Sequence, residues 1–236
     1  MCIRDSLYRS GLFFVVNLFW KAGETMGNIM DYLKWRGDLT FSQDAFNEVD
    51  NLLLSYVAYV NLEGLSVGAG EEQVTLEEVS RRFFVLHSEE ELAADKSFTR
   101  LAPYIVKMMA QSNRYRTSII SNYVNMVNPQ LELQFSAVQL DLSDGSKNFC
   151  FRGTDDNIVA WKEDFNLGLG EVPAQKLASE YLNRFGVGTS TIRVSGHSKG
   201  GNLAVYAAAA CKIEVQERIT DVYSNDGPGF VHEFVT

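Results

Sequence analysis

The stretch that most constrains the fold of this chain runs from Thr191 to Ala210 and reads TIRVSGHSKGGNLAVYAAAA. Its first residues include Ile192 and Val194 in alternation with polar neighbours, which predicts a short strand. It then passes through Gly196-His-Ser-Lys-Gly200 and becomes alanine-rich, which predicts a helix. A strand, a sharp turn of the form G-x-S-x-G and a helix make up a nucleophile elbow. We therefore expect an α/β fold, with Ser198 at the turn.

Each residue type in this turn has a physical reason. Ser198 would occupy a strained backbone position that lifts its hydroxyl clear of the sheet, while Gly196 and Gly200 keep side chains out of the crowded turn. Gly201 would let the helix pack closely, and the start of that helix offers N–H groups where an oxyanion would form. The alternative is a glycine-rich turn with an incidental serine. The predicted strand before it and helix after it favour the elbow.

Composition excludes several classes of function. A chain of 236 residues can bury a full core, and its net charge of -9, without clustered Lys and Arg, argues against nucleic-acid binding. Cys2, Cys150 and Cys211 are too few and too far apart for a disulfide framework or a zinc site. The last two lie in apolar patterns that predict buried free thiols. The three histidines lack ligand spacing, so we expect neither a metal nor a cofactor.

Residues 1–25 differ from the rest of the chain. Gly11 to Trp20 is apolar but only about half as long as a membrane span. Arg4 and Arg9 precede it, as in a signal peptide, yet no small-residue cleavage site follows. We interpret residues 1–25 as a leader outside the domain and expect a cytoplasmic protein. A genuine signal in this segment would instead mean secretion.

The remainder, residues 26–236, reads as a single α/β domain with a helical N-terminal half. Residues 26–128 are mostly helical in pattern, with helices expected at 28–37, 42–58 and 75–84, and with one or two more within 92–111, interrupted at Pro103. The pattern changes after Pro129, and residues 129–236 carry the sheet and the elbow. Asp144-Gly145 predicts a hairpin between two short strands. A helix at 173–185 and a strand at 219–224 complete the pattern.

Two motifs in this order resemble a known family. Phe151-Arg-Gly-Thr154, followed by an acidic pair and by Trp161 and Asp164, resembles the oxyanion strand and loop of class 3, fungal-lipase-like lipases, which have the α/β-hydrolase fold. Gly196 to Ala204 resembles the elbow of the same lipases. This likeness covers about residues 130–236.

The opening segment Asp31 to Asp38, DYLKWRGD, further resembles an uncharacterised bacterial branch of lipase-like proteins called Mbeg-like. The likeness to this branch covers most of the chain from Met26 onward.

The lipase resemblance implies an ester hydrolase. Ser198 would be the nucleophile that attacks an ester carbonyl and forms an acyl-enzyme. The backbone N–H of Lys199 and the N–H or hydroxyl of Thr154 would hold the oxyanion. Asp164 and Trp161 would anchor the loop behind Thr154.

Two charged side chains near these motifs have structural interpretations. Lys199 departs from the family pattern, which commonly has an apolar residue there, and we expect its side chain to extend into water. Attraction of an acidic lipid head group is the alternative. For Arg152 we expect a salt bridge under the site. Contact with a membrane surface would suit a lipase, but no basic amphipathic helix indicates it.

The rest of a catalytic triad is not apparent. In α/β-hydrolases an acid and then a histidine follow the serine. Asp226, at a predicted strand end, is the candidate acid, although the resemblance implies that residues 225–229 form a structural turn. His232 follows it too closely to reach between Asp226 and Ser198, and His197 would point away from the hydroxyl. We therefore expect a C-terminally truncated chain with weak activity or none.

Two classes of function follow from these observations. The first is a serine hydrolase of carboxylic esters or lipids, with a thioesterase or an acyltransferase as variants that use the same elbow. The second is a catalytically inactive relative that binds a lipid or a protein partner. Restoration of an acid and a histidine downstream would favour the first class.

Overall fold

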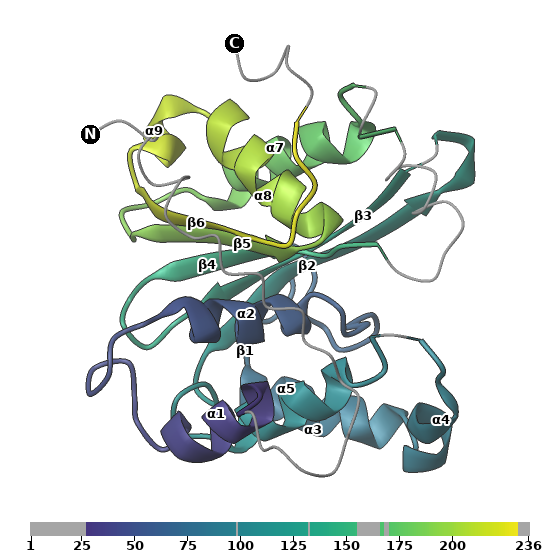
Figure 1. Cartoon of the computed structure of the whole chain (residues 1–236), viewed down its shortest axis with the longest axis vertical. Helices are drawn as coiled ribbons and strands as arrows, with labels where there is room; N and C mark the ends of the chain where they lie inside the picture. Colours follow the sequence, from purple (N-terminus) through teal and green to yellow (C-terminus); the bar gives the residue numbers. More distant parts are fainter. Residues whose placement is uncertain (1–26, 98, 132, 155–165, 168–169, 231–236) are drawn as a thin grey trace.

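The computed structural model describes residues 27–97, 99–131, 133–154, 166–167 and 170–230. These residues form a mixed α/β fold, as predicted. Its helices are α1 (Ile29–Arg36), α2 (Glu48–Val57), α3 (Leu76–Leu86), α4 (Glu89–Ala94), α5 (Ala102–Gln111), α7 (Pro173–Phe185), α8 (Lys199–Ala210), α9 (Ile213–Gln216) and the 3-10 helix η2 (Pro129–Leu131). Figure 1 shows three layers, in which α7 and α8 cover one face of a central sheet and α1, α2, α3 and α5 lie on the other side.

The sheet has six strands in the described residues, arranged in chain order. They are β1 (Val74–Thr75), β2 (Ile119–Asn128), β3 (Leu133–Asp141), β4 (Lys147–Phe151), β5 (Ile192–His197) and β6 (Ile219–Asn225). The pairs from β1 to β4 are antiparallel, whereas β4, β5 and β6 are parallel. The carboxyl ends of β4, β5 and β6 therefore lie together at one edge of the sheet, which we call the carboxyl edge.

The predicted helices are present, with shifted ends. Asn28 caps α1, and Thr75 caps α3 by accepting a hydrogen bond from the N–H of Glu78, the third residue of that helix. The helix expected from residue 42 begins only at Glu48, because Asn47 caps it with two hydrogen bonds to backbone N–H groups. Pro103 lies in the first turn of α5 and does not interrupt a helix, since that position needs no N–H donor.

The sheet begins earlier in the chain than the change of pattern at Pro129 indicates. β2 lies in the half expected to be mostly helical, and its pairing with β3 shifts register between Ser121 and Val124. Asn122, inside this bulge, has a φ of 54°. The bulge breaks the polar–apolar alternation that would have revealed the strand. The hairpin at Asp144-Gly145 is confirmed and joins β3 to β4.

Two apolar cores lie on the two sides of the sheet. Between the sheet and α7 and α8, the strands contribute mainly Phe135, Ala137, Phe149, Phe151, Ile192 and Val194. Against the N-terminal helices they contribute mainly Ile120, Val138, Leu140 and Cys150. Cys150 and Cys211 are buried free thiols, as predicted.

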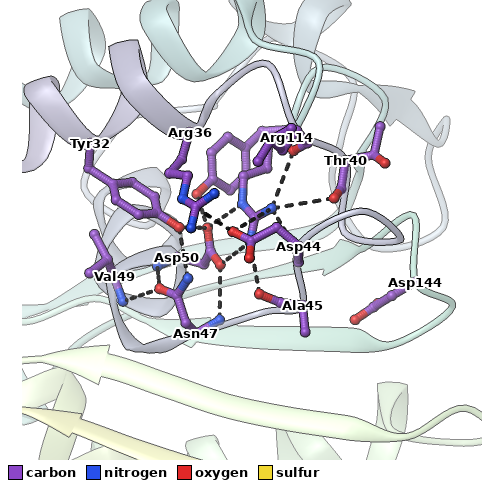
Figure 2. A network of polar contacts seen from close by, with 12 residues as sticks. Tyr32, Arg36, Thr40, Asp44, Ala45, Asn47, Val49, Asp50, Arg114 and Asp144 are labelled. Carbon is purple, nitrogen blue, oxygen red and sulfur yellow. Dashed lines mark hydrogen bonds and ion pairs between the residues drawn. The ribbon is translucent and has the colours of Figure 1, made fainter.

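A buried ion pair fixes the N-terminal helices to one another (Figure 2). Arg114, fully buried after α5, donates to Asp50 of α2 through Nε at 2.6 Å and Nη2 at 2.5 Å. The same guanidinium donates to the backbone oxygens of Asp44 and Ala45. Tyr115 also donates to Asp50. Burial alone would lower the pKa of Arg114, but the neighbouring Asp50 carboxylate raises it. The start of α2 is thus held by several hydrogen bonds.

Candidate functional site

The predicted strand–turn–helix around Ser198 is present as β5, a turn and α8. We call residues Gly196 to Gly200 the Ser198 turn. Ser198 has φ 56° and ψ -130°, a conformation that costs a residue with a side chain about 1–3 kcal/mol. Its N–H donates to Asn225 O at 2.8 Å, and its carbonyl accepts from Gly201 N at 2.8 Å. The surrounding backbone therefore holds Ser198 in a strained geometry.

The glycines of this turn have no room for side chains. A Cβ on Gly196 would overlap the backbone of Gly200, and a Cβ on Gly200 would overlap the carbonyl of Phe151 in β4. On Gly201 a Cβ would lie 2.7 Å from Ser224 Oγ. These contacts agree with the steric reasons given for the glycines from sequence.

The end of β4 lies directly beside the Ser198 turn. Phe151 pairs with Gly196 across the parallel strands, and a Cβ on Gly153 would lie 3.1 Å from Ser198 Cβ. Thr154 follows and is only 5% exposed. The structure therefore brings together the two segments that the sequence motifs single out. Trp161 and Asp164 lie outside the described residues.

Two basic side chains near the turn are buried. Arg152 is 7% exposed and donates to Asn125 Oδ1 at 3.0 Å. Lys199 is fully buried, and its Nζ donates to the backbone O and the Oε1 of Gln134, both at 2.7 Å. The expectation that Lys199 extends into water is wrong. Ala137 is the β3 residue that pairs with the last residue of β4, so Gln134 lies beyond that end and can offer the ammonium the acceptors that burial demands.

Asp226 and His197 lie in different surroundings near Ser198. Asp226 follows β6 directly, is exposed and has a φ of 53°. Asn225 pairs with His197, so Asp226 is level with Ser198 along the sheet. His197 Nδ1 lies 2.9 Å from the Tyr59 hydroxyl. Burial lowers the pKa of His197, and the Asp226 carboxylate partly opposes this.

Ser198 is half-buried, and its Oγ has no hydrogen bond to any residue that the structure describes. His232 lies outside these residues. The loop after β6 packs on the start of α8, because Asn202 Nδ2 donates to the carbonyls of Pro228 and Gly229, both at 3.1 Å. This packing agrees with the structural turn that the resemblance implies for residues 225–229.

Sequence reasoning missed the contribution of α2 to this site. Asn51 and Ser55 in α2 and Tyr59 just beyond it are four residues apart and lie on one side of the helix. Asn51 and Ser55 bond to Asn225, and Tyr59 bonds to His197. We call these three residues the α2 stripe. The available signal was a row of polar residues at helical spacing inside an apolar segment.

The comparison with protein families identifies the chain. A family model described as Mbeg1-like matches residues 109–236, more than half of the sequence. The chain belongs to the Mbeg1-like family. The Mbeg1-like match begins within α5 and includes Thr154, Ser198 and Asp226, whereas the α2 stripe precedes it. No curated protein and no solved structure matches the chain.

In the described part of this Mbeg1-like chain, no group of three or more His, Cys, Asp or Glu side chains is arranged to hold a metal ion. None of the helices there is long and apolar enough to span a membrane.

Proposed function

We propose that this Mbeg1-like chain is a serine hydrolase of the α/β-hydrolase type that acts on carboxylic esters or lipids. The observation that carries the proposal is the backbone of Ser198, at φ 56° between a parallel strand and a helix, beside the end of β4. Strained residues of this kind persist where the surrounding structure fixes them, and they gather at functional sites. Ser198 is half-buried, so it would be accessible to a small acyl group.

In the proposed reaction Ser198 Oγ attacks the ester carbonyl, its proton passes to a base, and the alcohol leaves from an acyl-enzyme that water then hydrolyses. Lys199 is the first residue of α8, and the first N–H groups of a helix point out of its end. That N–H, together with Thr154 at the end of β4, would receive the oxyanion. One such donor typically contributes about 3 kcal/mol to stabilisation of the transition state.

Asp226 is level with Ser198 and is the candidate acid, and His232 is the histidine that follows it in the sequence. The Tyr59 contact of His197 turns its Nδ1 toward the N-terminal helices, which supports leaving His197 out of the triad.

The test is labelling of the full chain with a fluorophosphonate probe. In keeping with the weak activity expected from the sequence, we expect the probe to label the wild type slowly and Ser198→Ala not at all. Ser179→Ala is the matched control, because the Ser179 hydroxyl bonds to the Lys176 carbonyl within α7, away from the Ser198 turn, and this variant should label normally. Asp226→Asn and His232→Ala then test the acid and the base by their labelling rates. A wild type that does not react would contradict the proposal.

One observation favours a second function. No described histidine hydrogen-bonds to Ser198, which would suit an inactive relative that uses the site to bind an acyl chain. Saturable binding of a long-chain fatty acid, without labelling by the probe and without hydrolysis of p-nitrophenyl esters, would support this alternative.

A further inference from the structure

The α2 stripe is unusual because polar side chains occupy the buried face of a helix. Asn51 and Ser55 are each 1% exposed. Buried polar groups destabilise a fold unless they form hydrogen bonds, so these positions need a reason. Their contacts supply this reason, because the stripe forms hydrogen bonds with residues at the carboxyl edge of the sheet.

The first two residues of the stripe hold Asn225. Asn51 Nδ2 donates to Asn225 Oδ1 at 2.9 Å, and Asn225 Nδ2 donates to Ser55 Oγ at 3.1 Å. Asn225 Nδ2 also donates to Gly196 O at 3.1 Å, and the carbonyl of Asn225 accepts the Ser198 N–H. Asn225 therefore connects α2 with both ends of the strained segment.

The third residue touches the Ser198 turn itself. The Tyr59 hydroxyl lies 2.9 Å from His197 Nδ1 and 3.3 Å from His197 O. A Cβ on Gly153 would meet this hydroxyl and would also approach Ser198 Cβ. Tyr59 therefore lies where the turn meets the end of β4, against the two segments that the proposed reaction needs side by side.

The opposite end of the helix is fixed. Asp50, the residue before Asn51, accepts two hydrogen bonds from the buried Arg114 guanidinium (Figure 2). A helix held in this way at its start can position side chains along its length, because backbone hydrogen bonds make it stiff.

We propose that the α2 stripe braces the Ser198 turn and that Tyr59 is a positioning residue for Ser198. The Tyr59 hydroxyl holds His197 and the end of β4 in place, and the strained φ of Ser198 persists because the stripe opposes its relaxation. The effect on reactivity rests on the proposed function, whereas the bracing of the turn does not.

The experiment compares Tyr59→Phe and Ser55→Ala with the wild type. Tyr123→Phe is the matched control, because Tyr123 is also buried on this side of the sheet and its hydroxyl bonds to Asn61. Hydrogen exchange at the Ser198 amide reports local opening of the turn, since this N–H donates to Asn225 O. The rate of fluorophosphonate labelling is measured on the same samples.

We expect Tyr59→Phe to speed exchange at the Ser198 amide about fivefold, the effect of one typical hydrogen bond, and to slow labelling by a similar factor. Ser55→Ala should act in the same direction, and Tyr123→Phe should change neither rate. Unchanged exchange in both stripe variants would overturn the bracing. Faster exchange with unchanged labelling would overturn the positioning role. If the wild type does not react with the probe, the proposed function fails and the exchange rates alone decide.

Discussion

The two faces of the sheet differ in the side chains that they bury. Toward α7 and α8, the central strands present large apolar side chains, including Phe149, Phe151 and Val194, all fully buried. Tyr181 of α7 packs edge-on against the rings of Phe149 and Phe151. Non-directional burial of this kind stabilises the fold without requiring a unique contact geometry.

Toward α2, the same strands present buried polar side chains next to apolar ones. Asn148 Nδ2 donates to Ser195 Oγ at 3.1 Å, and Cys150 Sγ contacts the carbonyl of Leu54 at 3.4 Å. At the carboxyl edge this polar face continues into Asn225 and the α2 stripe. Hydrogen bonds are directional, so they fix positions more narrowly than apolar packing does.

The contrast indicates a division between stability and positioning. The apolar face anchors β5 and α8, while the polar face controls how the turn between them is held. Substitutions on the first face should lower global stability and leave the relative geometry of the turn intact. Substitutions in the α2 stripe, on the second face, should change the turn more than the stability. The Arg114–Asp50 pair is an exception on this side of the sheet, because its loss should lower global stability. The pair fixes the start of α2 and makes the helix rigid enough to position the stripe.

The largest effect should come from Arg114→Met. This variant leaves the Asp50 carboxylate buried without its counter-ion, which typically costs about 3–5 kcal/mol. Urea unfolding measures the loss. The double variant Asp50→Asn/Arg114→Met should recover part of it, because neither charge then remains buried. Arg81→Met, at an exposed arginine paired with Glu78, should leave the unfolding midpoint close to that of the wild type. A small loss of stability in Arg114→Met would contradict our interpretation that the ion pair fixes the start of α2.

Leu182→Ala tests the apolar face. Leu182 is fully buried in α7, and its truncation should cost about 3 kcal/mol in urea unfolding through lost burial and a residual cavity. Exchange at the Ser198 amide under native conditions should stay close to the wild-type rate, because local opening of the turn does not involve α7. Selective acceleration at Ser198 in this variant would contradict the division between the two faces.

Gly200→Ala tests the contact between the turn and β4. Its Cβ would overlap the carbonyl of Phe151, so the backbone must shift, at a cost of about 2 kcal/mol. Fluorophosphonate labelling should be lost even where the variant remains folded by circular dichroism. Gly170→Ala is a suitable control, since a Cβ there meets nothing within 4 Å. Normal labelling of Gly200→Ala would show that the proposed reaction tolerates movement of the turn.

Local patterns predicted much of this fold. Three predicted features depend only on neighbours in sequence, and the structure has all of them. They are the strand and helix on either side of Ser198, the Thr75 cap and the Asp144-Gly145 hairpin. The lipase resemblance implied that Thr154 lies near Ser198, and in the structure Gly153, the residue before it, lies against the Ser198 turn.

The parts that the sequence could not reveal depend on long-range contacts. Lys199 is buried because Gln134, far away in the sequence, lies beyond the end of β4. Arg114 reaches Asp50 only once α2 and α5 are packed together. The bulge at Asn122 interrupts the polar–apolar alternation by which β2 could have been predicted from the sequence. In each case a single side chain or turn gains its role from the tertiary structure, which one sequence read locally does not contain.

The smallest expected effect is a pH dependence at His197. Burial lowers its pKa below the ordinary value of about 6.5, so on acidification the unfolded chain takes up this proton before the folded chain does. The contribution of His197 to stability is therefore complete above about pH 6.5 and declines as the pH falls below it. Urea midpoints at pH 7.5 and 5.5 should differ more for the wild type than for His197→Gln. His87→Gln, at a half-exposed histidine after α3, should retain the wild-type difference. Equal differences in all three proteins would mean that the polar face holds the turn without any contribution from the protonation state of His197.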